Sequence, residues 1–444
     1  MAKPSANVRR RRGSDDGGRV VPLSPKVAKQ NKKGKQSILA YSGFRPLIVV
    51  GVLILSVVIA ALLTNRIVKS PIEAVSYDLG DVIPLEGVLA VNDRLTDAEL
   101  LFENQVYGPE SLTLDEQTQK LYAGFRTGLI AQISVKDGKE KIGPAVRLAQ
   151  GEQECDGSYK TMHLCGRPLG LRISPSGELI VADAYLGLFA INWEAEKVVK
   201  IVGAGELPSN DENAPPIKYL NDVDFLPDGR IIFSESSTKF DDRDFILDLF
   251  EHQPNGRLLI YEPVKKSLRV LKDGLYFPNG VQVSIEKGVG KNAPFRVLYS
   301  EMAKARVMQI WVPQDHYSTE PVKVAPLIEN LPGYPDNIRL TKSGHLLVPI
   351  PAHRSAEDRV LGHYPLLREF ITKMLSPQAL GYVGNLLTGA NGLVIKVNTE
   401  TGQMIESYHD PTGRVQSVSI ALDDGKGRML LGSDVNYYIG RAKL

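Results

Sequence analysis

The sequence predicts an all-β protein, a six-bladed β-propeller, preceded by a disordered basic tail and one transmembrane helix. Three observations predict this architecture. An uncharged apolar run of 18 residues lies near the N-terminus, a basic segment precedes it, and a pattern of paired short strands recurs six times further on. The parts expected are a tail at 1–45, an anchor at 46–64, a linker leading into the propeller at 65–107, and the propeller at 108–444.

The apolar run reads PLIVVGVLILSVVIAALL, from Pro46 to Leu63. As a helix it would be about 27 Å long, which matches the hydrocarbon core of a bilayer. A cleaved signal peptide is disfavoured, because the run and the segment before it are too long and no small-residue cleavage site follows. A buried core helix would show a polar face, and this run has none beyond Ser56. The run is therefore interpreted as a single-pass signal anchor.

The tail before the anchor holds twelve Lys and Arg residues against two acids, although the whole chain has a net charge of only +2. The positive-inside rule keeps such a tail in the cytoplasm and exports the C-terminal body. This predicts a type II membrane protein of the endoplasmic reticulum or plasma membrane. The tail is expected to be disordered and to contact anionic lipid headgroups. Next to a membrane anchor, the same charge argues against nucleic acid as a partner.

The chain has two cysteines, Cys155 and Cys165, which lie ten residues apart on the exported side. Because exported proteins fold in an oxidising compartment, a disulfide between the two is expected. The sequence contains no N-x-S/T sequon, so N-glycosylation is not expected even though the body is exported.

The exported body repeats one pattern: a polar position, apolar residues two and four positions later, a turn, and a second apolar run. Strict alternation of this kind is typical of a half-buried strand. Turn signals such as SPSG and LPDG follow the first strands, and runs such as LIVADA and IIFSES follow the turns. Units of about 55 residues that hold several short strands predict a six-bladed propeller. The six instances begin at Glu110, Leu169, Asn221, Asn279, Asp336 and Gln416.

Two inserts interrupt the repeat. A helical insert at 355–380 contains YPLLREFITKML, and a shorter one in blade three contains FILDLF at 245–250. These inserts could pack onto the disc, cover the site as a lid, or contact the membrane surface, and the sequence leaves the alternatives open. The apolar positions that share one helical face of the first insert are Leu366, Leu367, Phe370, Ile371 and Met374.

The first residue of each instance is expected at the mouth of an inner strand, so six equivalent positions converge on one end of the central channel. Oxygen donors from several blades suit a hard divalent cation there. Calcium fits best, because it accepts neutral amide oxygens and irregular coordination. The alternative is that Asp and Asn at these positions only cap backbone groups in turns. The positions that indicate calcium are Glu110, Asn221, Asn279 and Asp336, which carry carboxylate or carboxamide groups.

The motifs LNDV, FPNGV and YPDNI, in this order and spacing, resemble those of the calcium-dependent six-bladed propeller lactonases and esterases, which include paraoxonases and gluconolactonases. GPESL, CGRPLGL, LIVADAYLGL and SSTKF are similar to the strictosidine synthase-like branch, and the similarity covers nearly the whole chain. The resemblance implies a calcium ion in the central tunnel and arylesterase-type hydrolysis. The calcium ligands that it implies are Asn221, Asn279, Asp336 and the neighbouring Asn337. Glu110 is added from its register in the repeat, since the place of this carboxylate relative to Gly-Pro shifts between branches of the family.

Two departures limit what the resemblance implies about mechanism. Paraoxonases carry a catalytic His where this chain has Leu169, and Leu cannot move a proton. The catalytic Glu of strictosidine synthase cannot be aligned with a residue here, so the carbon–carbon condensation of that enzyme is not assumed. The sequence also lacks G-x-S-x-G, CxxC and HExxH motifs, which argues against a serine triad, structural zinc or a metalloprotease.

If the chain is a hydrolase, calcium would polarise the carbonyl of an ester or lactone and a general base would activate water. Candidate bases at strand ends are Asp183, Glu235 and Glu301. Asp183 is the first choice, because paraoxonases place their base in the same blade. His353, beside the helical insert, is a further candidate. The alternative for Asp183 is a buried carboxylate that pairs with backbone groups or with an arginine such as Arg306. The alternative for His353 is a structural or solvent-exposed side chain.

Three functions stay open. The favoured one is a calcium-dependent hydrolase that acts on small apolar esters or lactones. The second is a non-catalytic surface protein whose propeller presents a binding face around a structural calcium. The third and least favoured is a strictosidine synthase-type condensation enzyme. Resemblance in fold cannot decide among them, because propellers host many functions.

Overall fold

The computed structural model describes residues 44–115, 117–151, 153–211, 213–284, 293–316, 318, 321–387 and 391–444. The disordered tail predicted at 1–45 therefore lies outside the described residues, except for its last two positions. The chain divides into two compact units, Met1–Ala61 and Leu62–Leu444.

The helix α1 spans Phe44–Ile67 and contains the predicted apolar run. Its segment Val49–Ile67 has a mean hydropathy of 2.2. A helix of this length and composition can cross a bilayer, since about 20 apolar residues span the hydrocarbon core. The helix is apolar all round, unlike the amphipathic helices of the body.

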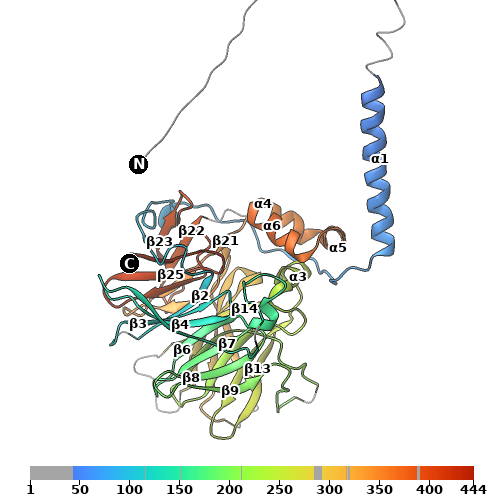
Figure 1. Ribbon diagram of the computed structural model, residues 1–444. Helices are drawn as coiled ribbons and strands as arrows, with labels where there is room; N and C mark the ends of the chain where they lie inside the picture. The colour runs from blue at the N-terminus through green and yellow to red at the C-terminus, as the bar shows by residue number, and fades with distance from the viewer. Residues whose placement is uncertain are drawn as a thin grey trace, which may run out of the picture. The chain divides into compact units, whose positions relative to one another are not determined.

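Six four-stranded antiparallel sheets follow one another along the chain as the blades of a propeller (Figure 1), which confirms the predicted fold class. The first strands of neighbouring blades contact one another around the ring, so they surround the propeller axis. The end of the axis at which these inner strands begin is called the mouth below. A small sheet of β18 (Gly333–Tyr334) and β21 (Ala352–His353) lies beside blade five.

The strands of blades one to three have the following bounds. They are β2 (Pro109–Asp115), β3 (Lys120–Phe125), β4 (Leu129–Ser134) and β5 (Lys141–Arg147); β6 (Pro168–Ile173), β7 (Leu179–Asp183), β8 (Gly187–Asn192) and β9 (Lys197–Gly203); β10 (Tyr219–Phe225), β11 (Ile231–Ser237), β12 (Gly256–Glu262) and β13 (Ser267–Leu275).

The remaining blades follow the same meander. Their strands are β14 (Pro278–Ser284), β15 (Phe295–Glu301), β16 (Arg306–Val312) and β17 (Lys323–Ile328); β19 (Arg339–Leu340), β20 (Leu346–Pro349), β22 (Gly392–Val397) and β23 (Met404–Asp410); β24 (Ile420–Asp423), β25 (Arg428–Gly432) and β26 (Ile439–Lys443), with β1 (Glu99–Leu101) as the fourth strand of blade six.

The ring is closed by a strand from the other end of the chain. β1 pairs antiparallel with β26, so Glu99 lies opposite Arg441 and their side chains form an ion pair at 2.6 Å. This pairing covers an edge that would otherwise be open to aggregation. The segment 65–107, expected as a linker, thus contributes a strand to the last blade.

The structure corrects the predicted phase of blade six. The turn bond from the Asp424 N–H to the Arg428 carbonyl (2.9 Å) matches the turn bonds of other blades and places Ser419, not Gln416, at the mouth position. Ser419 is fully buried. The true instance, SIALD, ends in Asp423, where the pattern requires an apolar residue. The segment QSVSI, which begins at Gln416, fits the alternating pattern better than SIALD does, although it begins three residues before the true mouth position.

Apolar side chains fill the spaces between blades. Leu112 of blade one, for example, shares a cluster with Ile420 and Leu430 of blade six. A fully buried Leu or Ile contributes about 1.5–3 kcal/mol. Since each such cluster joins neighbouring blades, the packing fixes the spacing of the inner strands and with it the geometry of the mouth.

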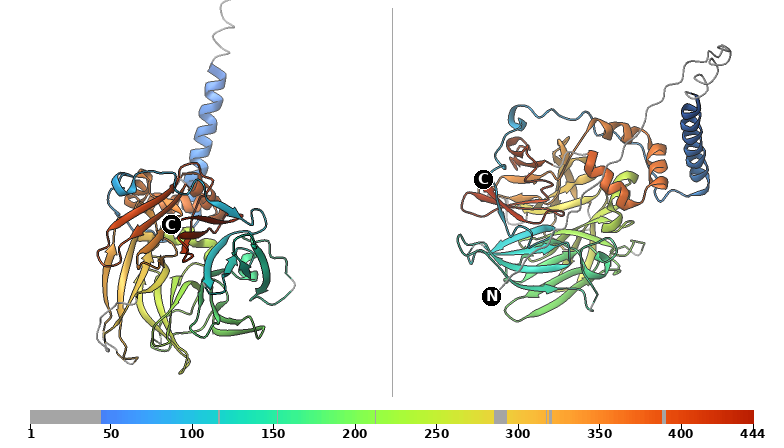
Figure 2. Two further views of the ribbon diagram at one scale, coloured as in Figure 1. Left: turned by 90° about the vertical axis from the view of Figure 1, so that its left-hand side faces the viewer. Right: turned by 45° about the horizontal axis from the view of Figure 1, so that its top comes forward.

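Helices gather at the mouth end, because the loops between second and third strands return there. The insert of blade five folds as three helices that lie together with α3 at one end of the propeller (Figures 1 and 2). The bounds of the short and long helices are η1 (Gly87–Leu89), α2 (Met162–Cys165), η2 (Asp242–Asp244), α3 (Phe245–Glu251), η3 (Met302–Lys304), α4 (Ala356–His363), α5 (Pro365–Met374) and α6 (Pro377–Leu387).

The face of α5 that packs on the propeller differs from its apolar face. Arg368 and Thr372 are buried, and of the predicted apolar positions Ile371 joins a core cluster. Leu366 and Met374 are 77% and 43% exposed. The apolar face of this helix is therefore not simply packed onto the disc.

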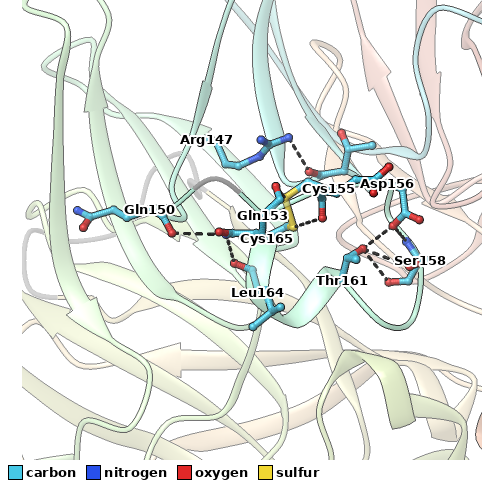
Figure 3. Close-up of a disulfide and its surroundings, with 11 residues drawn as sticks. Arg147, Gln150, Gln153, Cys155, Asp156, Ser158, Thr161, Leu164 and Cys165 are labelled. Carbon is cyan, nitrogen blue, oxygen red and sulfur yellow. Dashed lines mark hydrogen bonds between the residues drawn. A yellow bond between two sulfur atoms is a disulfide. The ribbon is translucent and has the colours of Figure 1, made fainter.

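The predicted disulfide is present. Cys155 and Cys165 are bonded, with Cα atoms 5.8 Å apart. Within the closed loop, Asp156 Oδ1 accepts hydrogen bonds from the Thr161 hydroxyl (2.5 Å) and the Ser158 N–H (2.9 Å), as Figure 3 shows. These bonds, the Thr161 bond first, lower the pKa of Asp156 to about 2. The bridge ends two residues before Arg167, so it orders the chain that enters the mouth.

Candidate functional site

The predicted ligand residues lie where four inner strands begin. Glu110 is in β2, Asn221 in β10 and Asn279 in β14, and Asp336 with Asn337 directly precedes β19; all five are buried. Asn337 Nδ2 donates to Glu110 Oε1 across the axis at 3.1 Å. Blades one and five, which are far apart in sequence, thus meet at one point.

Each of these side chains keeps a buried oxygen without a hydrogen-bond partner among the described residues. An unpaired buried acceptor is destabilising by about 1–3 kcal/mol, so five in one place indicate a ligand rather than a packing fault. The described ranges hold no group of three or more His, Cys, Asp and Glu placed as metal ligands, and the donors are two carboxylates with three amides. That mixture could hold a hard divalent cation. The oxygens are Glu110 Oε2, Asn221 Oδ1, Asn279 Oδ1, Asp336 Oδ1 and Asn337 Oδ1.

The two carboxyl groups are electrostatically coupled. Burial raises the pKa of Glu110 well above its usual range, and the charge of Asp336 raises it further. Burial also raises the pKa of Asp336, and the next contribution comes from the Asp434 charge. Both groups therefore favour the protonated form unless a cation neutralises them.

Buried hydroxyl groups hold the backbone of the mouth residues. Ser234 Oγ donates to the Asn279 carbonyl at 2.5 Å, Ser300 Oγ to the Asp336 carbonyl at 2.9 Å, and Ser419 Oγ to the Glu110 carbonyl at 3.0 Å. The strands also approach closely at Gly280, where a Cβ would lie 2.4 Å from the Ile338 nitrogen. A larger residue at position 280 would push blades four and five apart.

One residue further along the strand of Asn221, a buried carboxylate is neutralised by an arginine of the chain itself. Asp222 follows Asn221 and accepts two hydrogen bonds from the Arg339 guanidinium, at 2.6 and 3.0 Å. Both residues are fully buried. Breaking such a pair by removal of one partner costs about 3–5 kcal/mol, because a charge is left buried alone. The pair ties the strand of Asn221 to that of Asn337 across the axis.

A buried guanidinium faces the donor residues from blade two. Arg167 is 2% exposed, its Nε lies 3.8 Å from Asp242 Oδ2, and in the described part of the chain its Nε and Nη1 have no hydrogen-bond partner. Its charge lowers the pKa of Glu110, against the larger effect of burial. Asp242 also accepts the hydroxyl of Tyr219 at 3.0 Å. Arg167 can therefore donate to a ligand oxygen.

An apolar wall borders the same position. Leu169, which stands where paraoxonases carry a catalytic His, is buried in a cluster with Tyr219 and Phe277. The two rings meet edge to face, with centroids 5.8 Å apart. This wall can hold an apolar group but cannot transfer a proton.

Asp183, the first choice as general base, lies at the end of β7. Its Oδ1 accepts the N–H groups of Tyr185 (2.9 Å) and Leu186 (3.0 Å). Its Oδ2 is buried and has no partner within the described ranges. Burial raises the pKa of Asp183 to about 6, against the opposing effect of the backbone bonds.

The other predicted acids are paired with arginines. Glu235 accepts Arg257 Nε at 2.5 Å and the Lys218 N–H at 2.6 Å. Glu301 accepts Arg306 Nε at 2.7 Å and the Tyr276 N–H at 2.9 Å. These contacts fit the structural alternative.

His353, in β21, bonds through Nε2 to the Asn391 carbonyl at 3.0 Å. Burial lowers the pKa of His353, which favours the neutral ring. The bond joins the two chain segments that flank the helical insert, so it also fits a structural role.

Three residues near the donors were not singled out as site residues from the sequence: Arg167, Asp242 and Asp434. Asp434 follows β25 in MLLGSD much as Asp183 ends β7 in LIVADA, and that parallel could have found it. Asp242 lies in a loop outside the repeat, where periodicity carries no signal. Arg167 lies in the motif CGRPLGL, before the first strand of blade two, and so falls outside the alternating pattern.

The cavities identified lie elsewhere. One of about 710 Å³ has none of the predicted site residues in its lining. A smaller cavity, of about 330 Å³, likewise has none of them. Its charged side chains include Arg230, Glu262 and His316, which belong to blades three and four. The chemistry discussed here therefore rests on the mouth residues and not on these cavities.

The fold and the mouth together define a class, the six-bladed propellers with oxygen donors gathered at the axis. The family models of strictosidine synthase and of the N-terminal part of strictosidine synthase-like proteins match residues 221–315 and 87–133. The chain belongs to the family of adipocyte plasma membrane-associated proteins, within the strictosidine synthase-like group. This confirms the resemblance found in the sequence.

The relatives cover nearly the full chain. The adipocyte plasma membrane-associated protein of Gallus gallus is 32% identical over 431 residues, 95% of this chain and 97% of that protein. The Homo sapiens protein is 32% identical over 88% of each chain, and a strictosidine synthase-like protein of Arabidopsis thaliana is 28% identical over 81% of this chain and 89% of its own length. A solved gluconolactonase from Xanthomonas campestris aligns with a TM-score of 0.49 at 13% identity, over 85% of this chain and 98% of that one.

We expect Arg339→Leu to lower the free energy of unfolding by about 3–5 kcal/mol, because it leaves the Asp222 carboxylate buried and unpaired. Denaturant titration of the purified chain measures the change. Asp222→Asn combined with Arg339→Leu should recover part of the loss. Arg359→Leu, which removes an exposed pair with Asp81, is the control and should change stability by less than about 1 kcal/mol. Equal effects of the two single substitutions would contradict the argument.

Proposed function

We propose that this chain is a membrane-anchored, calcium-dependent hydrolase of small apolar esters or lactones, with its propeller on the exported side of the membrane. The observation that carries the proposal is the set of five buried oxygens at the mouth that have no hydrogen-bond partner among the described residues. The buried guanidinium of Arg167, two of whose nitrogens have no hydrogen-bond partner in the same ranges, and the apolar wall supply what an apolar ester needs for binding. The names of the relatives point to the plasma membrane.

The ion would be held by the five mouth residues. The two carboxylates would balance a double positive charge, and the amides add neutral oxygens, which calcium accepts more readily than magnesium does. When bound, calcium supplies Lewis-acid polarisation of an ester carbonyl. The residues that would hold it are Glu110, Asn221, Asn279, Asp336 and Asn337.

The chain's own residues would do the rest of the chemistry. Arg167 would donate a hydrogen bond to the carbonyl oxygen and stabilise the negative charge that develops on it. The wall of Leu169, Tyr219 and Phe277 would hold the apolar acyl or aryl group and exclude water from it. Asp183 would take the proton of the attacking water, because among the predicted acids it keeps an oxygen free, whereas Glu235 is occupied by Arg257.

A second function, a non-catalytic binding protein with a structural calcium, is favoured by a specific observation. Asp183 Oδ1 caps two backbone N–H groups, which is a structural use of this carboxylate. Leu169 also replaces a proton carrier with an apolar side chain. The same five oxygens would then bind an ion that fixes the mouth as a recognition surface.

Calcium should raise the melting temperature of the purified chain, since a ligand at 100 times its Kd stabilises by about 2.7 kcal/mol. Asn279→Ala combined with Asp336→Ala should abolish this response. Gln416→Ala, which the structure places outside the mouth ring, is the matched control and should keep it. Thermal unfolding with and without chelator measures the effect. An unchanged response in the double variant would remove the assignment of these ligands.

Phenyl acetate hydrolysis by the purified chain should require calcium and disappear with chelator. Asp183→Asn should lower kcat by about 10²–10⁴-fold while the calcium-dependent rise in melting temperature stays. Since the base must be ionised and its pKa is about 6, kcat of the unsubstituted chain should rise as pH increases through about 6. A folded, calcium-responsive chain without esterase activity would favour the binding protein.

Protease added to sealed microsomes should trim only the N-terminal tail and leave the propeller intact. The reason is the basic segment before α1, which the positive-inside rule retains in the cytoplasm. Immunoblots with antibodies against either end of the chain measure the outcome. Digestion of the propeller without detergent would reverse the proposed orientation.

A further inference from the structure

The insert helices present apolar side chains to solvent on one side. In α5, Leu366, Leu367 and Met374 are exposed, and at 3.6 residues per turn they fall within an arc of about 100°. The buried residues Arg368 and Thr372 lie on the other side of the helix. The exposed stripe therefore lies on the side of α5 that faces away from its packing contacts, and does not result from a frayed helix end.

The other helices of the insert also expose large apolar side chains, and these together with the stripe on α5 are called the insert patch here. Tyr382 of α6 is 69% exposed, whereas Leu380 of the same helix is buried in a core cluster. Large apolar side chains exposed together on one insert are a mark of an interaction site. The insert patch comprises Val360, Tyr364, Leu366, Leu367, Met374, Leu375, Tyr382 and Val383.

The chain that leaves α1 is attached to the same helices within a few residues. α1 ends at Ile67, and Ile72 is buried in one cluster with Leu247 of α3 and Leu380 of α6. Five residues can span at most about 18 Å. The insert therefore cannot lie far from the point where the chain leaves α1.

Further contacts make this attachment firm. The Ala74 N–H donates to Glu369 Oε1 in α5 at 3.3 Å, and the Tyr77 N–H donates to the Gly362 carbonyl in α4 at 3.0 Å. The Tyr77 ring stacks on His252, with centroids 3.6 Å apart. The segment after α1 is thus fixed to the insert and does not act as a free linker.

The insert belongs to the mouth end of the propeller. It connects β20 to β22, the second and third strands of blade five, and loops of that kind return to the end where inner strands begin. Figures 1 and 2 agree in placing α4, α5 and α6 at one end of the disc. The insert patch and the donor residues therefore share one end.

We propose that the insert patch dips into the lipid interface of the bilayer that α1 crosses, so that the mouth of the propeller faces the membrane. Leu366, Leu367 and Met374 would enter the acyl boundary, and Tyr364 and Tyr382 would lie at headgroup depth, where tyrosines are enriched. The docking of the insert patch rests on the membrane crossing proposed for α1, but not on calcium or hydrolysis. Together with the proposed hydrolase function, it names the substrate class as lipophilic esters dissolved in the bilayer.

Lipid quenching tests the proposal on the full chain in phosphatidylcholine vesicles. Leu366→Cys carries an environment-sensitive fluorophore, and the disulfide-bonded Cys155 and Cys165 do not react with the label. The control is Val264→Cys, at a position that is 91% exposed in the loop between β12 and β13, at the end opposite the mouth. Lipids with spin labels near the headgroup should remove roughly half of the Leu366→Cys fluorescence and leave the Val264→Cys fluorescence unchanged.

Two outcomes would overturn the proposal. Equal, unquenched fluorescence at both positions would show that the insert patch stays in water. A Leu366→Cys label that is shielded from water but not quenched by lipid would mean that a lid movement or a protein partner covers the patch. Protease protection of the same vesicles reports separately whether α1 crosses the bilayer, and the calcium response reports on the mouth. Leu367→Asp with Met374→Asp, added to the labelled chain, should abolish the quenching without changing that calcium response.

Discussion

Closure of the ring is the constraint on which the rest of this structure depends. β1, near residue 100, pairs with β26 at the C-terminus, and this pairing brings blade six against blade one. The contact between the Ser419 hydroxyl and the Glu110 carbonyl exists because of that closure. Without it, Glu110 would not meet Asn337 of blade five, and the donor residues would belong to separate blades rather than to one site. The linker segment is therefore part of the site's architecture although it contributes no ligand.

Within the closed ring, the neighbouring residues Asn221 and Asp222 of one strand differ in whether their side chains have partners. Asp222 is neutralised by the fixed guanidinium of Arg339, whereas Asn221 keeps an oxygen unpaired at the mouth. Internal pairing makes one layer of the axis independent of any ion. The layer above it contains carboxyl groups whose pKa is raised by burial. The strand register therefore separates an internally paired carboxylate from the residues of the mouth by one position.

Sequence periodicity could predict the fold and most of the mouth, because alternation and turn spacing repeat wherever an inner strand begins. It failed at blade six, where Asp423 breaks the alternation. The mouth position was therefore assigned to Gln416, three residues before Ser419. Periodicity could not assign Arg167 or Asp242 to the site, because their position depends on loops that do not repeat. It also identified the apolar positions of α5 but left open which way they face, and the structure buries Arg368 while Leu366 and Met374 are exposed. The repeated inner strands could be predicted from the sequence, whereas the closing strand β1 and the loops and helices over the mouth could not.

The same reasoning connects the chemistry at the mouth with the surface around it. Leu169 exchanges a proton carrier for an apolar contact, and Tyr219 and Phe277 continue that apolar wall. A site of this kind favours ligands that are poorly soluble in water, and such ligands concentrate in membranes. The insert patch and the short attachment to α1 lie at the same end of the propeller as the wall. If the mouth binds apolar ligands as proposed, a mouth that opened only toward water would meet few dissolved ligands, whereas one held at a bilayer would meet them at their highest concentration.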